Sequence, residues 1–129
     1  TAVKITNNGG EREERWLCGK TYYNFDTQKI IAAQKGRLLL FDLRFNIAPD
    51  SNGITNIDVW LQAPGQKLSH TTLIIRTTSQ VTVHRLSFTA FVPFYNSIHE
   101  NGAEVYIQSD DAASLWRPEF TFACLYNPP

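Results

Sequence analysis

Residues 36–62 read GRLLLFDLRFNIAPDSNGITNIDVWLQ, and this stretch decides the fold. Every second residue from 39 to 47 is large and apolar, whereas the positions between them hold polar residues from 42 to 46. Successive side chains of a β-strand point to opposite faces, so this alternation predicts a strand with one face in a core and one mostly in water. Leu38 and Leu40 begin the otherwise polar row.

A second strand of the same kind follows a cluster of turn-forming residues at 48–53. Ile57, Val59 and Leu61 alternate with polar residues, and Trp60 interrupts the polar row. Two consecutive half-buried strands are typical of antiparallel β-sandwiches and barrels rather than of a catalytic motif.

The rest of the chain repeats this pattern. Strands are predicted over 71–78, 103–108 and 115–126. In the segment 81–92 the apolar parity shifts at positions 84–85, which predicts a β-bulge or a bend where the chain passes between sheets. Roughly seven to nine short strands, with turn signals about every 8–12 residues, predict an all-β sandwich or barrel.

Two segments have a less regular pattern. Residues 26–35 (DTQKIIAAQK) are compatible with a short helix, since Asp26 or Thr27 could cap it and Gly36 could end it, although their two isoleucines favour a strand equally. The sequence at 99–102 (HENG) predicts a turn of the Asn-Gly class.

Length and composition predict one globular domain. The chain has 129 residues, of which 43% are hydrophobic, enough for a self-sufficient core. Twelve basic residues balance twelve acidic ones, and this zero net charge predicts no general attraction to nucleic acid or to an anionic membrane. The apolar runs are too short to span a bilayer. We expect a single domain over residues 16–129.

Residues 1–15 are expected to form an extended N-terminal arm. They contain no apolar core of a signal peptide, and the chain begins with a small residue, so we expect a complete chain made in the cytoplasm. The sequence at 11–15 (EREER) carries both charge signs, which suits either a solvated segment or ionic contacts with a neighbouring subunit. The candidate contact residues are Glu11, Arg12, Glu13, Glu14, Arg15 and Trp16.

The two cysteines lie near opposite ends of the chain. Cys18 and Cys124 both have apolar or aromatic neighbours, which favours two buried thiols that act as small hydrophobic residues. A disulfide is the alternative, if the first and last strands are adjacent and the compartment is oxidising.

The sequence contains no strong catalytic or metal-binding motif. His70, His84 and His99 share no metal-ligand spacing, and no nucleophile elbow, zinc-protease motif, P-loop or dinucleotide fingerprint is present. Asp110 and Asp111 could serve glycoside hydrolysis or calcium binding, but the pattern favours solvated loop residues. We therefore predict a protein that is not an enzyme and carries no cofactor or metal.

Three aromatic residues fall outside the main core series. Trp60, Tyr106 and Trp116 could stack on sugars or anchor a protein interface, and a second sheet or a neighbouring subunit could equally bury them.

The segment 45–61 (FNIAPDSNGITNIDVWL), with TTLII at 71–75 and NGAEVYI at 101–107, resembles small structural proteins of tailed bacteriophages. The similarity covers roughly residues 36–126 and is to jelly-roll modules found as capsid decoration (cement) proteins, head fibres and tail-needle or fibre tips. It implies an antiparallel jelly-roll-like β-sandwich. A charged arm precedes this domain instead of a heptad-repeat or collagen-like stalk, which suits a protein attached to a capsid lattice.

The resemblance leads to a functional hypothesis. The chain is expected to be a non-enzymatic virion protein that binds the major capsid protein and neighbouring copies of itself as a homo-oligomer, a trimer or a dimer, and stabilises the head. A receptor- or carbohydrate-binding knob using Trp60, Tyr106 or Trp116 is the alternative, and a small hydrolase using Asp110 or Asp111 is a third.

Overall fold

The computed structural model describes residues 2–6, 12–15, 23–24, 26–31 and 35–126. Ten strands and one short helix form in these ranges, with the bounds that follow. The elements are β1 (Val3–Ile5), β2 (Arg12–Arg15), β3 (Tyr23–Asn24), β4 (Lys29–Ile30), β5 (Leu38–Pro49), β6 (Gly53–Ala63), β7 (Gln66–Thr77), β8 (His84–Pro93), α1 (Asn96–Asn101), β9 (Glu104–Ser109) and β10 (Ala113–Tyr126).

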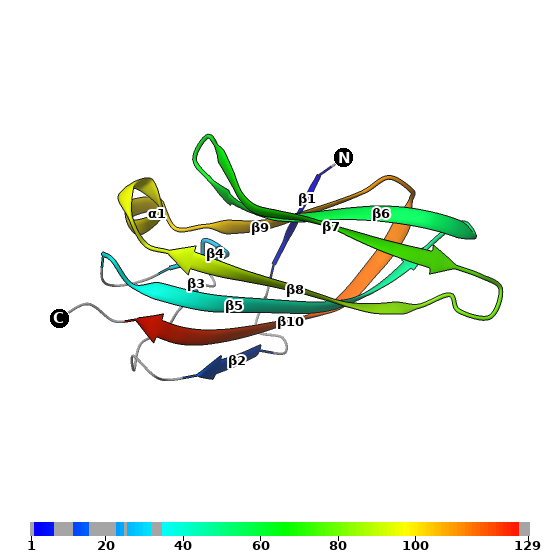
Figure 1. Cartoon of the computed structure of the whole chain (residues 1–129), viewed down its shortest axis with the longest axis horizontal. Coiled ribbons are helices and arrows are strands. Elements are labelled where there is room, and N and C mark those ends of the chain that lie inside the picture. Colours follow the sequence, from blue (N-terminus) through cyan, green and yellow to red (C-terminus); the bar gives the residue numbers. More distant parts are fainter. Residues whose placement is uncertain (1, 7–11, 16–22, 25, 32–34, 127–129) are drawn as a thin grey trace.

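Two four-stranded sheets lie face to face (Figure 1). The first, which we call the β5 sheet, has the order β2-β10-β5-β8, and the second, the β6 sheet, has the order β1-β9-β6-β7. The short pair β3-β4 forms a third, two-stranded sheet. The prediction of an all-β sandwich is confirmed.

Most connections carry the chain from one sheet to the other. Strands β5 and β6, which the sequence places one after the other, do not pair, because the connection after Pro49 crosses between the sheets. The connections from β7 to β8, β8 to β9 and β9 to β10 also change sheet. Strands β6 and β7 form a hairpin around the predicted tight turn at 63–65.

The core lies between the inner faces of the two sheets. On β5, the inward residues from Leu39 to Ile47 are at most 2% exposed, as their alternation predicts. Phe41 is surrounded by aromatic rings, with ring centroids 6.5 Å from Phe88, 5.3 Å from Phe120 and 5.2 Å from Phe122. Edge-to-face and tilted contacts of this kind stabilise a core beyond the area that they bury.

The N-terminal strands join the two sheets separately. Strand β1 pairs antiparallel with β9, whereas β2 pairs in parallel with β10 over Phe120–Ala123. Every other pair within the two four-stranded sheets is antiparallel. The jelly-roll topology stays a prediction, since a jelly roll is built from antiparallel Greek keys and β2 departs from that rule.

The shift of apolar parity at positions 84–85 marks a crossing between sheets, one of the two outcomes predicted for it. Residues 78–83 connect β7 of the β6 sheet to β8 of the β5 sheet, and β8 begins at His84. A true irregularity interrupts β10 instead, between Trp116 and Glu119, where Arg117 has a φ of 55° next to Pro118.

The structure decides the two irregular segments. Residues 26–28 form a turn and β4 follows it, so for these described residues the helix considered over 26–35 is wrong and the strand favoured by the isoleucines is confirmed. The turn expected at 99–102 is the end of α1, which stops at Gly102. Asn-Gly marks a chain reversal whether it forms a turn or ends a helix, because glycine readily adopts the backbone angles that end a helix.

Gly102 occupies a position that only glycine fits. Its φ is 74° and its ψ is −171°. A Cβ atom there would lie 2.7 Å from the backbone oxygen of Ile30. The backbone bonds between Ile30 and Ala103, with N–O distances of 2.8 and 3.0 Å, hold these two segments together.

We expect Gly102→Ala to lower the free energy of unfolding by about 3 kcal/mol, because the backbone strain and the clash with Ile30 add. Gly65→Ala is the matched control, since Gly65 also has a positive φ, of 69°, but has open space where its Cβ would stand. Its expected loss is about 1 kcal/mol. Urea denaturation of the two variants measures the difference, and equal losses would contradict the role given to the contact with Ile30.

Cys124 lies in the core, is 1% exposed, and is disulfide-bonded. Cys18, the only other cysteine of the chain, lies outside the described residues. The interpretation of Cys124 as a reduced thiol is therefore wrong, and the disulfide alternative holds for it. The pairing of Arg15 in β2 with Ala123 in β10 gives a physical reason, because it brings the N-terminal segment beside Cys124.

Candidate functional site

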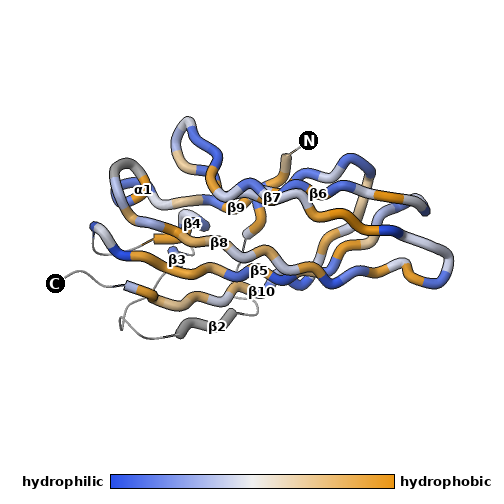
Figure 2. Tube along the Cα trace, in the orientation of Figure 1, coloured by the Kyte–Doolittle hydropathy of each residue, from blue (hydrophilic) through white to orange (hydrophobic). Residues whose placement is uncertain are grey.

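The outer face of the β5 sheet is divided into an apolar end and a polar end. Along β5, Leu38 and Leu40 face outward at one end, and Asp42, Arg44 and Asn46 face outward further along. Hydrophobic colours dominate the start of β5, and hydrophilic positions interrupt the strand further on (Figure 2). Residues opposite each other on paired strands point to the same face, so the apolar end and the polar end both continue from β5 onto β8 and β10.

We define the apolar end by six residues that share this outer face. Leu40 lies opposite Phe91 of β8 and Ala123 of β10, and Leu38 lies opposite Pro93 and, beyond a shift of register after Cys124, opposite Tyr126. Phe91 is 60% exposed and Tyr126 is 52% exposed. The residues of the apolar end are Leu38, Leu40, Phe91, Pro93, Ala123 and Tyr126.

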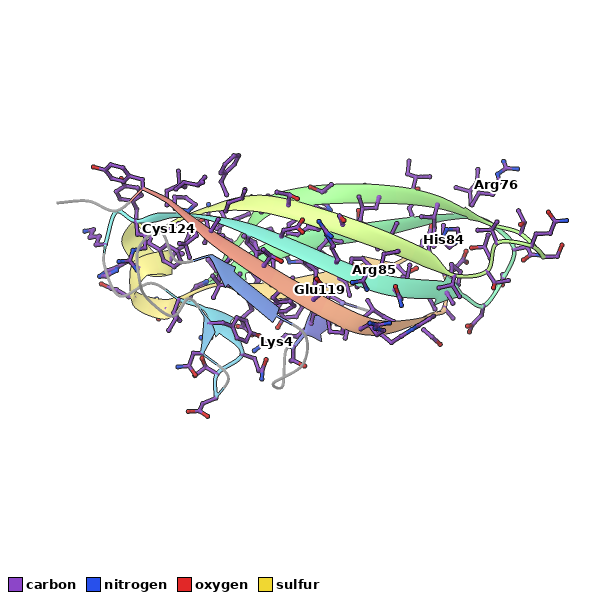
Figure 3. The ribbon with its side chains drawn as sticks, turned by 90° about the horizontal axis from the view of Figure 1, so that it is seen from below. Lys4, Arg76, His84, Arg85, Glu119 and Cys124 are labelled. Atoms are coloured by element: carbon purple, nitrogen blue, oxygen red, sulfur yellow. The ribbon has the colours of Figure 1, made fainter. Side chains whose placement is uncertain are left out.

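The polar end contains side chains that bind one another. The Arg85 guanidinium donates to Glu119 at 2.8 Å, to Asn46 at 3.2 Å and to the backbone oxygen of Arg117 at 3.0 Å. Arg85 and Glu119 point toward each other across β5 from β8 and β10 (Figure 3). These polar groups are already partnered, whereas the rings of Phe91 and Tyr126 at the apolar end are more than half exposed.

Two of the three predicted stacking aromatics meet on the outer face of the β6 sheet. The rings of Trp60 and Tyr106 stack with their centroids 6.0 Å apart. The Lys67 ammonium lies 4.2 Å from the centroid of the Trp60 ring, and the His70 ring contacts Trp60 edge-on at 5.9 Å. Trp60 is consequently only 3% exposed. Side chains of its own sheet cover it. For a buried ring at this position, the sequence pattern suggests only a second sheet or a neighbouring subunit as its cover.

Trp116 belongs to a different surface. It lies on β10 in the β5 sheet and is 37% exposed, whereas Trp60 and Tyr106 lie on β6 and β9. The structure therefore does not bring the three aromatic residues into one ligand-stacking site.

A hydrogen-bonded acidic residue lies beside the Trp60 cluster. The Asp58 carboxylate accepts a hydrogen bond from the Thr72 hydroxyl at 2.6 Å and lies 3.1 Å from Nε2 of His70. The Thr72 hydroxyl, followed by His70 and Lys67, lowers the pKa of Asp58 below its ordinary value, although partial desolvation opposes this shift. Asp58 thus remains a carboxylate that holds β7 against β6.

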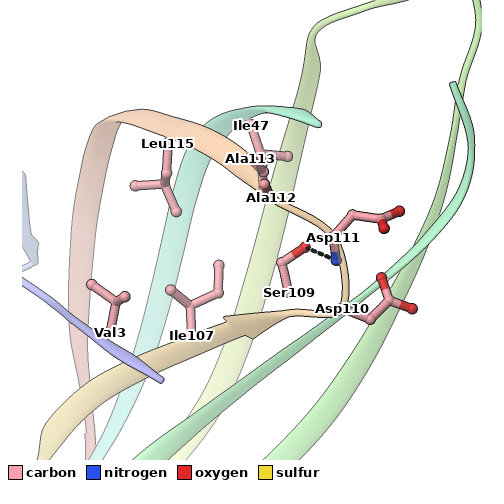
Figure 4. Close-up of a pocket in the computed structure, with 9 residues that line it drawn as sticks. All are labelled: Val3, Ile47, Ile107, Ser109, Asp110, Asp111, Ala112, Ala113 and Leu115. Atoms are coloured by element: carbon pink, nitrogen blue, oxygen red, sulfur yellow. Dashed lines mark hydrogen bonds between the residues drawn. The ribbon is translucent and has the colours of Figure 1, made fainter. Parts of the chain in front are cut away.

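An open pocket of about 330 Å³ lies where the two sheets separate near the connection between β9 and β10 (Figure 4). Its walls include Val3, Ile107 and Leu115, and its rim carries Asp110 and Asp111. The pocket is apolar inside, and the carboxylates of Asp110 and Asp111 point away from its apolar walls (Figure 4).

The two acidic residues of the rim bind strand β6. The Asp110 carboxylate accepts hydrogen bonds from the backbone N–H and the side-chain amide of Asn56, both at 3.0 Å. The Asp111 carboxylate accepts one from the buried Thr55 hydroxyl at 3.2 Å. Both carboxylates therefore fasten the β9–β10 connection to β6, which gives them a structural role that the sequence pattern did not reveal.

The three histidines lie apart from one another. His70 faces Asp58, Nε2 of His84 lies 3.1 Å from the Thr77 hydroxyl, and His99 lies on α1 beside a polar pocket that also contains Lys29. Within the described residues, no group of three or more His, Cys, Asp or Glu side chains could hold a metal ion. No helix in the described part of the chain is long and apolar enough to cross a membrane.

The predicted N-terminal contact residues fall on and around β2. Strand β2 comprises Arg12–Arg15 and pairs with β10, while Glu11 and Trp16 lie outside the described residues. This segment is therefore part of a sheet of its own chain, and its contact with a shell or a neighbouring subunit stays a prediction.

No protein-family model matches the chain, and no curated protein matches its sequence.

Sequence reasoning missed the apolar end as a site. The signal was present in part, because Leu38 and Leu40 stand at the start of a row that is otherwise polar. Phe91 and Tyr126 join them only through strand register, and residues so distant in the sequence could not be assigned to one face in advance.

Proposed function

We propose that this chain is a non-enzymatic structural protein of a bacteriophage virion, which binds the outside of the head and stabilises it as a homo-oligomer. The observation that carries the proposal is the apolar end of the β5 sheet. Contiguous exposed apolar surface is rare on monomeric proteins and marks sites of interaction, and aromatic residues are the commonest anchors of such sites.

Two further features support the proposal. The sequence resembles jelly-roll structural proteins of tailed bacteriophages over residues 36–126, and the fold class agrees with that resemblance. The disulfide at Cys124 suits a protein that works in an oxidising environment, such as a virion surface. The proposed partners are the major capsid protein and neighbouring copies of the chain.

The mechanism would depend on many weak contacts acting together. Each subunit would place its apolar end, anchored by Phe91 and Tyr126, on the capsid lattice. When subunits are linked to one another, each later contact forms at a high effective concentration, so modest single contacts sum to firm attachment. The shell would then resist internal pressure without any chemical reaction.

The experiment is co-sedimentation with heads of the phage that encodes the chain, after removal of their accessory proteins. Saturable binding is expected for the natural chain. Tyr126→Ser should weaken binding at least about tenfold, because exposed aromatic anchors commonly contribute this much or more.

Ile74→Ser is the matched control, since Ile74 is 68% exposed but lies on β7 of the β6 sheet. It should bind as the natural chain does. Equal weakening by both variants would remove the apolar end from the proposal. A stable oligomer that ignores heads would favour the alternative of a receptor- or carbohydrate-binding knob, and the partner would then be sought among host glycans.

A further inference from the structure

Strand β8 forms an edge of the β5 sheet. Its neighbour on one side is β5, and the described residues place no strand on the other side. The register between β5 and β8 is unbroken from Leu38 opposite Pro93 to Ile47 opposite His84. A ten-residue edge strand of this kind presents a row of unpaired backbone groups.

The free backbone groups belong to alternate residues. Just beyond β8, the Phe94 N–H donates to the Arg37 oxygen at 2.9 Å and the Gly36 N–H donates to the Phe94 oxygen at 2.7 Å. Residues in an antiparallel pair alternate between facing their neighbour and facing away, so Phe94 and every second residue before it face β5. The backbone groups of the odd-numbered residues 85–91 therefore point to the open side, and Pro93, which has no N–H, stands where none is needed.

This edge lacks the charges that usually prevent strands from pairing between molecules. Arg85 is drawn back across the sheet by Glu119, and the next outward residues, Ser87 and Thr89, are small and uncharged. Natural edges are commonly protected by lysine, by proline, by inward-pointing charge or by a bulge, and β8 has none of these between residues 86 and 92, since its one proline, Pro93, stands at the end of the strand.

Apolar side chains flank the same edge. Phe91 is 60% exposed on the outer face. Leu86 on β8 and Leu73 on the edge strand β7 point toward the core but are only partly buried. A strand added to β8 would cover Leu86 and Leu73 as well as satisfy the backbone groups, and it would leave the outward side of the Phe91 ring free for the head contact of the proposed function.

We propose that β8 is a dimerisation strand, which pairs antiparallel with β8 of a second copy of this chain about a two-fold axis at Thr89. In this register residues 85–93 lie opposite themselves, and each outward pair forms two backbone hydrogen bonds except Arg85 with Pro93, where Pro93 has no N–H to donate. The two β5 sheets then form one continuous sheet across both subunits. The proposal names the self-contact that the homo-oligomer of the proposed function requires.

The side chains of the strand fit this register. Ser87 faces Phe91 of the partner subunit, so a small side chain accommodates a large ring. Arg85 faces Pro93 of the partner subunit rather than a second arginine, and like charges do not meet. Thr89 faces Thr89 of the partner subunit, and because each hydroxyl donates to Asp42 of its own chain at 2.7 Å, two small side chains with partnered hydroxyls meet at the axis.

The test is the mass in solution, measured by light scattering after size-exclusion chromatography. The natural chain should have twice the 14.7 kDa of a monomer at micromolar concentration. Ser87→Pro removes an outward N–H at an edge position where proline is tolerated, so it should leave the fold intact and weaken dimerisation at least about tenfold. Ser87→Ala keeps the N–H and should remain a dimer.

Two variants at the axis test the register without proline. Thr89→Lys places like charges opposite each other and should yield monomers, whereas Thr121→Lys, on the outer face of β10, should not. Thr89→Cys should form a disulfide-linked dimer on mild oxidation, because the Cα atoms of such a pair lie about 5.5 Å apart, within the range that disulfides span.

The outcomes separate this proposal from the proposed function. A monomeric natural chain, a trimer, or a dimer unaffected by both Ser87→Pro and Thr89→Lys would overturn pairing through β8. A dimer that is sensitive to these substitutions but does not bind phage heads would support pairing and contradict the role on the head.

Discussion

Phe41→Ala is expected to lower the free energy of unfolding by about 3 to 5 kcal/mol. Phe41 is fully buried in the first half of β5, and its ring contacts the rings of Phe88, Phe120 and Phe122. Alanine would remove this ring and leave a cavity among side chains that both neighbouring strands hold in place. Since small domains are stable by roughly 5 to 15 kcal/mol, the variant should lose a large part of its stability.

Phe91→Ala is the matched control for this prediction. Phe91 has the same side chain and lies on the strand next to β5, but its ring points outward and is 60% exposed. Its expected loss is about 0.5 kcal/mol or less. Urea unfolding followed by tryptophan fluorescence gives both values, measured on dilute protein so that self-association does not contribute. A similar loss in the two variants would mean that the inward face of β5 is assigned wrongly.

Reduction of the disulfide at Cys124 is expected to lower the free energy of unfolding by about 2 to 5 kcal/mol. The bond restricts the unfolded chain and fixes a core residue that is 1% exposed at the end of β10. Unfolding curves of the oxidised chain with and without reductant give the size of the effect.

Cys124→Ala distinguishes the effect of losing the disulfide from any other effect of the reductant on unfolding. This variant keeps only one cysteine and cannot form a disulfide within the chain. Without reductant it should therefore unfold at the same denaturant concentration as the reduced natural chain, and adding reductant should not shift its midpoint. An unchanged midpoint on reduction of the natural chain would show that packing alone holds the end of β10. A large shift on reducing the variant would point to an effect of the reagent.

The class of fold follows from residues that are close in the sequence. The alternation at 39–47 and 57–61 specifies two half-buried strands, because a period of two can place apolar side chains only on one face. The sequence does not show that these strands lie in different sheets, since that depends on which later strand reaches each of them. The partners of β5 are β8 and β10, and they follow much later in the chain.

Local patterns were also ambiguous where a tertiary contact decides the structure. The Asn-Gly pair at 101–102 ends a helix because Gly102 packs against Ile30, which no local pattern reveals. Trp60 was correctly recognised as an aromatic residue in a polar row. Its neighbours on β7 and β9 cover it, so exposure could not be inferred from parity alone.

The strand order also has a consequence for synthesis of the chain. Leu39, near the start of β5, pairs with Cys124 of β10, so β5 gains its second neighbouring strand only after residues 113–126 have been made. Until then the backbone groups along this edge of β5 have no permanent partners. Contacts between distant residues make folding slow, on the order of milliseconds to seconds for all-β sandwiches. During translation the growing chain must therefore avoid pairing with other chains through the open edge of β5 until β10 has emerged from the ribosome.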